Sequence, residues 1–126
     1  MLADSKLQSI IWTSDVRKAE HFYTEILRLP FVGESHGALV YRINGADLRV
    51  SPVPRTGPTE HTVLGFAVAD VRTVVRKLAS LGIAIERIPD FRHDDDGILS
   101  VPGGGQVAWF RDPDGNLLSV VQYSDG

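Results

Sequence analysis

The sequence predicts an α+β fold made of two tandem βαβββ modules, with the helices on one face of each sheet. The first observation is a repeat. The tripeptide Asp-Val-Arg occurs at Asp15–Arg17 and again at Asp70–Arg72, separated by nearly half of the 126 residues. The second observation is that each copy follows a strand-like run and begins a stretch with helical periodicity. Because both the motif and the order of elements recur, the sequence indicates one small module built twice.

The first module is expected over residues 1–53. Ser14 or Asp15 can accept a hydrogen bond from the free amides at the start of a helix, and apolar residues follow at steps of three and four. Pro30 ends this helix, since proline disfavours the α conformation in the preceding residue. Asn44-Gly45 predicts a tight hairpin because both residues tolerate a positive φ. The strands predicted for this module are 7–13, 31–34, 38–43 and 47–53.

A linker is expected over residues 54–60, which are rich in Pro, Thr and Gly, and the second module over 61–126. Asp70 is the expected cap of its helix, and Leu81-Gly82 is the expected end. The other predicted elements of this module are strands at 61–68, 83–88, 105–111 and 117–123, a loop at 92–97 and a turn at 112–116.

Composition narrows the possible functions. The 13 Lys and Arg residues are scattered among 16 Asp and Glu residues, and the net charge is −3, so a nucleic-acid partner is not expected. The absence of cysteine excludes disulfides, thiolate metal sites and cysteine nucleophiles. The first residues do not resemble a signal peptide, and no apolar run approaches the ~18 residues of a membrane span. The expectation is a soluble cytoplasmic protein without a membrane partner.

The motif Phe110–Leu118 strongly resembles the hairpin near the C-terminus of the vicinal oxygen chelate superfamily. This superfamily includes glyoxalase I, fosfomycin- and bleomycin-resistance proteins and extradiol dioxygenases. Residues 14–30 look like its first-helix signature, in which an Asp cap is followed by the pair Phe22-Tyr23. The resemblance covers nearly the whole chain. It implies a cupped, mostly antiparallel sheet with the helices on the convex side, and a homodimer.

Enzymes of this superfamily hold one divalent metal on the concave sheet surface. The resemblance implies a His or Gln ligand on the first strand, a His on the first strand of the second half, and a Glu from the last strand of each half. Those positions here are Gln8, then Val63 or Leu64, and finally Arg49 and Ser119. Only Gln8 can bind a metal, and Arg49 would repel a dication. The prediction is therefore no metal and no other cofactor.

Two other cation sites remain open from the sequence. His61 belongs to the strand of the expected second-half ligand, so a displaced site could use His61 with Gln8, and His36 is a further candidate. His93 stands beside the acidic run Asp94–Asp96, which is either a cation site or a solvated loop between strands. We favour the solvated loop.

In place of a metal site, the sequence predicts a ligand pocket. Period-two alternation puts Gln8, Ile10 and Trp12 on one strand face, and the family mapping makes this the concave face. A fixed cation, hydroxyls, an amide and aromatic rings suit a small organic ligand that is anionic or rich in oxygen. The predicted ligand-binding residues are Gln8, Trp12, Arg49, Ser51, His61, Phe91, Trp109 and Ser119. The competing interpretation is core packing for the two tryptophans and, for Arg49, a surface role or an ion pair with Asp47.

Three functions compete on this basis. The favoured one is a metal-free small-molecule binding protein resembling the bleomycin-resistance branch. The alternative is a metal-dependent lyase or isomerase of the glyoxalase type. A third is metal-free catalysis, with Arg49 stabilising an enolate-like charge and His61 acting as a base. No catalytic residue is assigned.

Overall fold

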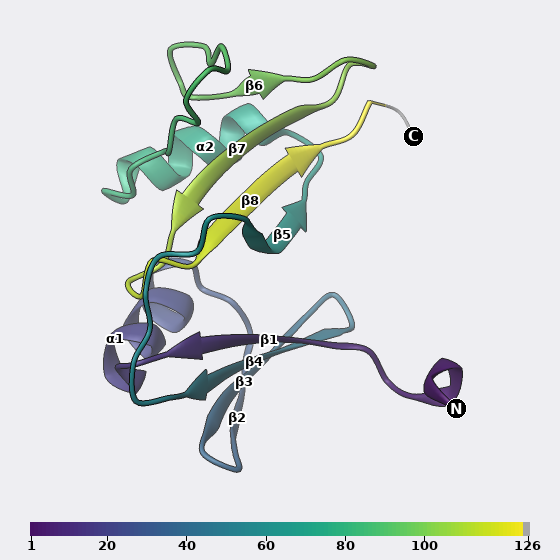
Figure 1. Ribbon diagram of the computed structural model, residues 1–126, viewed down its shortest axis with the longest axis vertical. Helices are drawn as coiled ribbons and strands as arrows, with labels where there is room; N and C mark the ends of the chain where they lie inside the picture. The colour runs from purple at the N-terminus through teal and green to yellow at the C-terminus, as the bar shows by residue number, and fades with distance from the viewer. Residues whose placement is uncertain (125–126) are drawn as a thin grey trace. The chain divides into compact units, whose positions relative to one another are not determined.

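The computed structural model describes residues 1–124 of the chain (Figure 1). The chain divides into two compact units: unit 1 is Met1–Gly57, and unit 2 begins at Pro58. Each unit contains a four-stranded sheet of its own, in which one pair of neighbouring strands is parallel and the others are antiparallel. The tandem βαβββ organisation and the α+β class are therefore confirmed, with each module forming an open mixed sheet.

Unit 1 begins with a short 3-10 turn, η1 (Leu2–Asp4), followed by β1 (Gln8–Thr13). The later strands are β2 (Phe31–Ser35), β3 (Ala38–Ile43) and β4 (Ala46–Pro52). The order across the sheet is β1-β4-β3-β2, with β1 parallel to β4. Asn44 and Gly45 have φ values of 50° and 87°, so the tight hairpin predicted between β3 and β4 is confirmed.

The helix of unit 1 changes its geometry halfway along. Regular α1 (Val16–Glu20) continues as the π-helix η2 (His21–Ile26), in which the Leu27 amide donates to the Phe22 carbonyl five residues earlier at 2.8 Å. Phe22 and its neighbour Tyr23 are both buried. Tyr23 packs near Tyr41 of β3, with ring centroids 6.0 Å apart. This segment therefore covers the sheet face on which Tyr41 lies.

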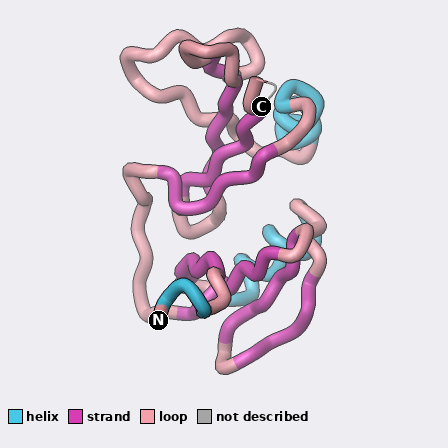
Figure 2. Tube along the Cα trace, turned by 90° about the vertical axis from the view of Figure 1, so that its right-hand side faces the viewer, coloured by secondary structure: helices cyan, strands magenta, loops and turns pink. Residues whose placement is uncertain are grey.

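Unit 2 contains β5 (Thr62–Ala67), α2 (Val71–Ser80), β6 (Leu99–Ser100), β7 (Gln106–Arg111) and β8 (Leu117–Gln122). The order across the sheet is β5-β8-β7-β6, with β5 parallel to β8. Buried Val71, Val75 and Leu78 form the inner side of α2, which packs against β7 and β8. Figure 2 shows this helix beside the strands of its own sheet.

The repeated tripeptide marks two matching helix caps. Asp15 Oδ1 accepts a hydrogen bond from the Lys18 amide at 3.1 Å, and Asp70 Oδ1 accepts one from the Thr73 amide at 3.2 Å. The two aspartates have nearly the same backbone conformation, with φ and ψ of −146° and 96° at Asp15 and of −142° and 96° at Asp70. Both predicted caps are confirmed.

The strand predicted at 83–88 is wrong. This segment forms only an isolated bridge, in which the Glu86 amide donates to the Trp109 carbonyl at 2.8 Å. A longer ladder is prevented because the next available donor, the amide of Ile88, is bonded at 3.0 Å to His93 Nε2. Pro89 follows and has no backbone N–H that could donate a hydrogen bond. The short strand β6, which the sequence did not predict, takes the edge of the sheet instead.

The turn between β7 and β8 is built around Asp112. Its Oδ1 accepts hydrogen bonds from the amides of Asp114 at 3.0 Å and Asn116 at 2.9 Å, and its Oδ2 accepts one from Asn116 Nδ2 at 2.8 Å. Gly115 has a φ of 87°, and a Cβ there would lie 2.9 Å from the Cα of Pro58. The predicted turn is confirmed, and it excludes a side chain at its glycine.

Candidate functional site

Each sheet has one face that its helix does not cover. In β1, Ile11 and Thr13 are 3% and 0% exposed, whereas Ile10 and Trp12 are 52% and 60% exposed. The buried side faces the helix, so the exposed side is the free face of unit 1, here called face A. The strand registers place these residues on face A: Gln8, Ile10, Trp12, Ala38, Val40, Arg42, Asp47, Arg49 and Ser51.

Arg49 lies in the middle of face A. It is level with Ile10 of β1 on one side and with Val40 of β3 on the other. Its Nη2 donates a hydrogen bond to the Ser35 carbonyl at 2.7 Å. No carboxylate among residues 1–124 pairs with Arg49. The guanidinium is therefore anchored at one nitrogen without being neutralised.

The ion pair considered between Arg49 and Asp47 is not formed. Asp47 instead accepts hydrogen bonds from Arg42 Nε at 2.9 Å and from Lys6 Nζ at 2.8 Å. These two bonds, the one from Arg42 first, lower the pKa of Asp47 to about 2. Two cations thus neutralise the carboxylate that would otherwise compete for Arg49.

The other predicted residues of unit 1 share this face. Gln8 is level with Asp47, and Trp12 is level with Ser51. Gln8 and Trp12 are exposed, and Ser51 is partly exposed. Four of the predicted residues, Gln8, Trp12, Arg49 and Ser51, are therefore brought together on one side of β1 and β4.

Unit 2 also has a free face, here called face B. Gln122 Oε1 accepts a hydrogen bond from the first amide of α2, that of Val71, at 2.9 Å, so Gln122 points to the helix side of β8. Alternate residues of β8 point the other way. The registers place these residues on face B: Thr62, Gly65, Ala67, Val107, Trp109, Arg111, Leu117, Ser119 and Val121.

Trp109 lies across face B. It is level with Ser119 of β8, and its indole Nε1 donates to the Thr62 Oγ1 of β5 at 3.0 Å. The side chain therefore crosses the whole width of β8. Thr62 was missed by the sequence reasoning. A register shift between Thr62 and Leu64 hides the partnership, because alternation alone does not predict which residue lies opposite.

Ser119 is predicted to bind ligand and is 8% exposed. Its neighbour across the strands is Gly65, where a Cβ would come within 2.9 Å of the Ser119 Oγ. Within residues 1–124 the Ser119 hydroxyl makes no side-chain hydrogen bond. The absence of a side chain at Gly65 thus leaves room for the Ser119 hydroxyl, which can still donate and accept hydrogen bonds.

Arg49 and Ser119 occupy matching positions in the two units. The fifth residue before each Asp cap is Ile10 in unit 1 and Gly65 in unit 2. Ile10 is level with Arg49 in the parallel pair of unit 1, and Gly65 is level with Ser119 in the parallel pair of unit 2. The module therefore carries a cation at this point in one copy and a hydroxyl in the other.

His61 and Phe91 lie outside the strands. His61 is exposed and immediately precedes β5. Phe91 is 59% exposed and belongs to the segment that follows Ile88, to whose carbonyl its amide is bonded at 3.3 Å. The strand registers place neither residue on face A or face B.

The residues at the expected metal-ligand positions do not fit a divalent metal. Gln8 and Arg49 share face A, where a guanidinium opposes a dication. Leu64 is level with Leu118 on the helix side of unit 2, and Ser119 offers only a hydroxyl. Residues 1–124 contain no group of three or more His, Asp or Glu side chains placed to hold a metal ion. This donor set supports no metal-dependent step.

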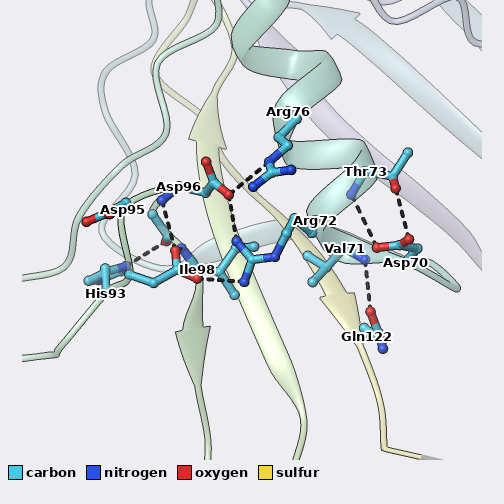
Figure 3. Close-up of polar contacts among 12 residues, drawn as sticks. Asp70, Val71, Arg72, Thr73, Arg76, His93, Asp95, Asp96, Ile98 and Gln122 are labelled. Carbon is cyan, nitrogen blue, oxygen red and sulfur yellow. Dashed lines mark hydrogen bonds and ion pairs between the residues drawn. The ribbon is translucent and has the colours of Figure 1, made fainter.

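Two carboxylates of the acidic run, those of Asp94 and Asp96, are neutralised by α2 (Figure 3). Arg72 donates to Asp94 Oδ2 at 2.7 Å through Nη2 and to Asp96 Oδ2 at 2.6 Å through Nη1, and Arg76 Nε lies 3.1 Å from the same Asp96 oxygen. Hydrogen bonds from Arg72 are the main cause that lowers the pKa of both aspartates. The cation-site interpretation is wrong, and the loop is docked on the helix rather than merely solvated.

A shallow polar hollow of about 460 Å³ lies at the start of α2. One of its two arginines, Arg72, is already neutralised by ion pairs with Asp94 and Asp96. The first amide of the helix, from Val71, is already bonded to Gln122. The hollow therefore has little binding capacity left, although sequence reasoning did not detect it. Its lining residues are Ala69, Asp70, Arg72, Thr73, Arg76, Gln106 and Gln122.

None of the helices in residues 1–124 has the length and apolar character needed to cross a bilayer. In comparisons with known proteins, residues 6–120 match the family model of the Glyoxalase/Bleomycin resistance protein/Dioxygenase superfamily. A search of curated proteins gives no match.

Solved structures with the same fold include a lactoylglutathione lyase from Agrobacterium tumefaciens, with a TM-score of 0.71 and 20% identity, covering 94% of this chain and 93% of that chain. A genomically encoded fosfomycin resistance protein from Listeria monocytogenes has a TM-score of 0.71 and 16% identity, with coverages of 97% and 95%. A glyoxalase/bleomycin resistance protein/dioxygenase from Alicyclobacillus acidocaldarius has a TM-score of 0.72 and 16% identity, with coverages of 97% and 93%. At these identities the likeness concerns the fold.

Proposed function

This chain belongs to the Glyoxalase/Bleomycin resistance protein/Dioxygenase superfamily, and from that premise we propose that it is a metal-free protein that binds a small organic anion, as in the bleomycin-resistance branch. The observation that carries the proposal is Arg49, a cation in the middle of face A without a carboxylate partner among residues 1–124. Its neighbours Ile10 and Trp12 supply apolar surface for the organic part of the ligand.

Arg49 is suited to capture an anion. A guanidinium has five N–H donors in a planar fork, and only the Nη2 bond to the Ser35 carbonyl is recorded here. The remaining donors match the two oxygens of a carboxylate or a phosphonate. Ile10 and Val40 on either side lower the local exposure to water, which strengthens an ionic hydrogen bond at this point.

The rest of face A favours an anion with an aromatic or other apolar body. The half-exposed indole of Trp12 offers a flat apolar surface, and Ser51 beside it offers a hydroxyl. Asp47 does not repel an anion strongly, because Lys6 and Arg42 already neutralise it. On face B, Trp109 and Ser119 form a second candidate binding surface, which offers an indole and a hydroxyl in place of a guanidinium.

Absence of a metal is part of the proposal, and a metal-dependent lyase or isomerase of the glyoxalase type is the alternative. Gln8 on face A favours the alternative, as does the fold shared with a lactoylglutathione lyase from Agrobacterium tumefaciens. The guanidinium of Arg49 on the same face opposes it. We also propose that the protein acts as a cytoplasmic homodimer, which sedimentation would detect as twice the mass of one chain.

The test is calorimetric titration with benzoate and phenylphosphonate, and with benzamide as the uncharged analogue. Arg49→Met is expected to weaken binding of both anions by roughly 10- to 100-fold, since hydrogen bonds to charged groups contribute about 1.5–3 kcal/mol, and to leave benzamide unchanged. Arg17→Met is the control, because Arg17 is a paired cation of α1, away from face A, and its loss leaves Asp47 neutralised.

Results of two kinds, from ligand binding and from metal content, would contradict the proposal. One is the absence of saturable binding by either anion, or equal losses for anion and amide in Arg49→Met. The other is one tightly retained Zn, Ni, Mn or Fe ion per chain after dialysis, which would favour the glyoxalase-type alternative.

A further inference from the structure

His93 is held by both nitrogens of its ring. Nε2 accepts a hydrogen bond from the Ile88 amide at 3.0 Å, and Nδ1 lies 2.8 Å from the Gly97 carbonyl oxygen. A carbonyl can only accept and an amide can only donate, so the proton of the ring is on Nδ1 and Nε2 is bare. The loop is therefore closed by a neutral imidazole in one tautomer. A second proton on Nε2 would point at the Ile88 N–H and break that bond.

The same ring lies against Trp109 of face B. The two ring centroids are 6.2 Å apart and the planes are inclined by 67°. The backbone reaches Trp109 as well, through the Glu86 amide that donates to its carbonyl at 2.8 Å. The segment from Glu86 to His93 thus contacts Trp109 twice, and the His93–Ile88 bond closes the part of the segment between these contacts.

The other half of the loop is fixed independently of His93. Asp94 Oδ1 accepts hydrogen bonds from the amides of Asp96 and Ile98, both at 2.9 Å. Arg72 and Arg76 hold the carboxylates of the acidic run against α2 (Figure 3). Because hydrogen bonds from Arg72 lower the pKa of Asp94 and Asp96, both stay ionised throughout the titration range of histidine. Protonation of His93 therefore breaks its bond to the Ile88 amide and leaves the carboxylates of Asp94 and Asp96 docked.

Most charged groups around His93 are already bonded to other residues, and the exceptions are exposed Arg92 and the exposed carboxylate of Asp95. On β7 and the segment facing it, Arg111 Nε is paired with Glu86 Oε1 at 2.9 Å, and Arg87 Nη2 donates to the Asp95 carbonyl at 3.2 Å. The carboxylates of Asp94 and Asp96 are paired with the arginines of α2. Exposed Arg92 adds a positive charge next in sequence, and β6 contributes apolar Leu99 through its bridge to His93.

From this geometry we propose that His93 is a positioning residue: its neutral ring supports Trp109 on face B alongside the bond from Trp109 to Thr62, and its protonation removes this support. The site therefore has a built-in response to protonation of this ring. The effect on Trp109 is independent of the proposed function. Only its consequence, a loss of ligand affinity on face B in acid, rests on that function.

The first measurement needs no variant of His93. In ¹⁵N-labelled protein without ligand at pH 8, the nitrogen shifts of His93 are expected to show a protonated Nδ1 and a bare Nε2. The Ile88 amide is expected to be protected from hydrogen exchange at pH 8, and this protection falls as His93 takes up its second proton. A ring protonated at Nε2 in the neutral state would overturn the proposal.

The second measurement uses tryptophan fluorescence. The chain has two tryptophans, so Trp12→Phe leaves Trp109 as the sole emitter. Its emission is expected to change in one reversible single-proton step as the pH is lowered from 8. The step is expected to vanish in Trp12→Phe/His93→Gln and to persist in Trp12→Phe/His61→Gln. A step that survives His93→Gln, or no step in the parent, would refute the role of His93 whether or not any ligand binds.

Discussion

The indole Nε1 of Trp109 donates to the Thr62 Oγ1 at 3.0 Å and so connects two strands that are not neighbours in the sheet. Trp109 belongs to β7 and Thr62 begins β5, while β8 lies between them. The bond closes face B over Ser119 with a rigid ring. The first prediction concerns this bond.

Thr62→Val keeps the shape of the side chain and removes the acceptor. It is expected to lower the free energy of unfolding by roughly 0.5–1.5 kcal/mol, the usual contribution of one neutral hydrogen bond. Urea unfolding of Thr62→Val, Trp109→Phe and the double variant forms a cycle that isolates the pair. A coupling energy of zero would show that the bond contributes nothing to stability.

Arg72→Met is expected to destabilise the protein in a pH-dependent way. The folded-state pKa values of Asp94 and Asp96 are lowered, chiefly by Arg72, so their contribution is complete above the unfolded pKa of ~3.9 and is lost as the pH falls through the folded values. Urea unfolding should therefore separate the variant from the parent at pH 7, and the difference should disappear in strong acid.

The control for the ion pairs of Arg72 is Arg76→Met, which removes one contact to Asp96 and leaves both Arg72 bonds in place. Its effect should be the smaller of the two. Equal stability losses for Arg72→Met at pH 7 and below both folded pKa values would contradict the assignment.

Gly65→Ala places a methyl group 2.9 Å from the Ser119 Oγ. It is expected to turn the hydroxyl aside and to cost about 1 kcal/mol of stability, at the low end for overpacking, because a serine side chain can rotate. The double variant Gly65→Ala/Ser119→Gly should regain the lost stability, which thermal unfolding measures. Failure of the double variant to recover would place the strain in the backbone of β5 instead.

Asp112→Ala removes the acceptor for three hydrogen bonds in the turn between β7 and β8. The expected loss is about 2–3 kcal/mol, since the bonds involve a charged group that is 6% exposed. Asp112→Asn keeps one oxygen acceptor and should lose less stability than Asp112→Ala. If both variants unfold at the same urea concentration as the parent, the turn does not depend on this side chain.

The sequence was sufficient where structure depends on neighbouring residues. The Asn44-Gly45 hairpin, the two Asp caps and the turn at Asp112 are each closed by bonds within a few residues, so their chemistry is visible in a short segment. On face A, alternation grouped Gln8 with Trp12 within β1, and the resemblance to the family was needed to place Arg49 of β4 on the same face.

The sequence was insufficient where a distant side chain competes with the backbone. His93 occupies the amide of Ile88 and shortens the expected strand to one bridge. Arg72 reaches Asp96, 24 residues away, and converts a predicted solvated loop into a docked one. Thr62 meets Trp109 across 47 residues. No local pattern encodes these pairings, because each depends on how the strands and α2 pack.

The equivalence of Arg49 and Ser119 has a consequence for what the two modules can offer. In a symmetric assembly of identical single modules, any mutation appears in every copy at once. A chain that carries both modules in one polypeptide does not have that constraint, so one module can hold a guanidinium where the other holds a hydroxyl. The two halves can therefore offer different chemistry at matching positions.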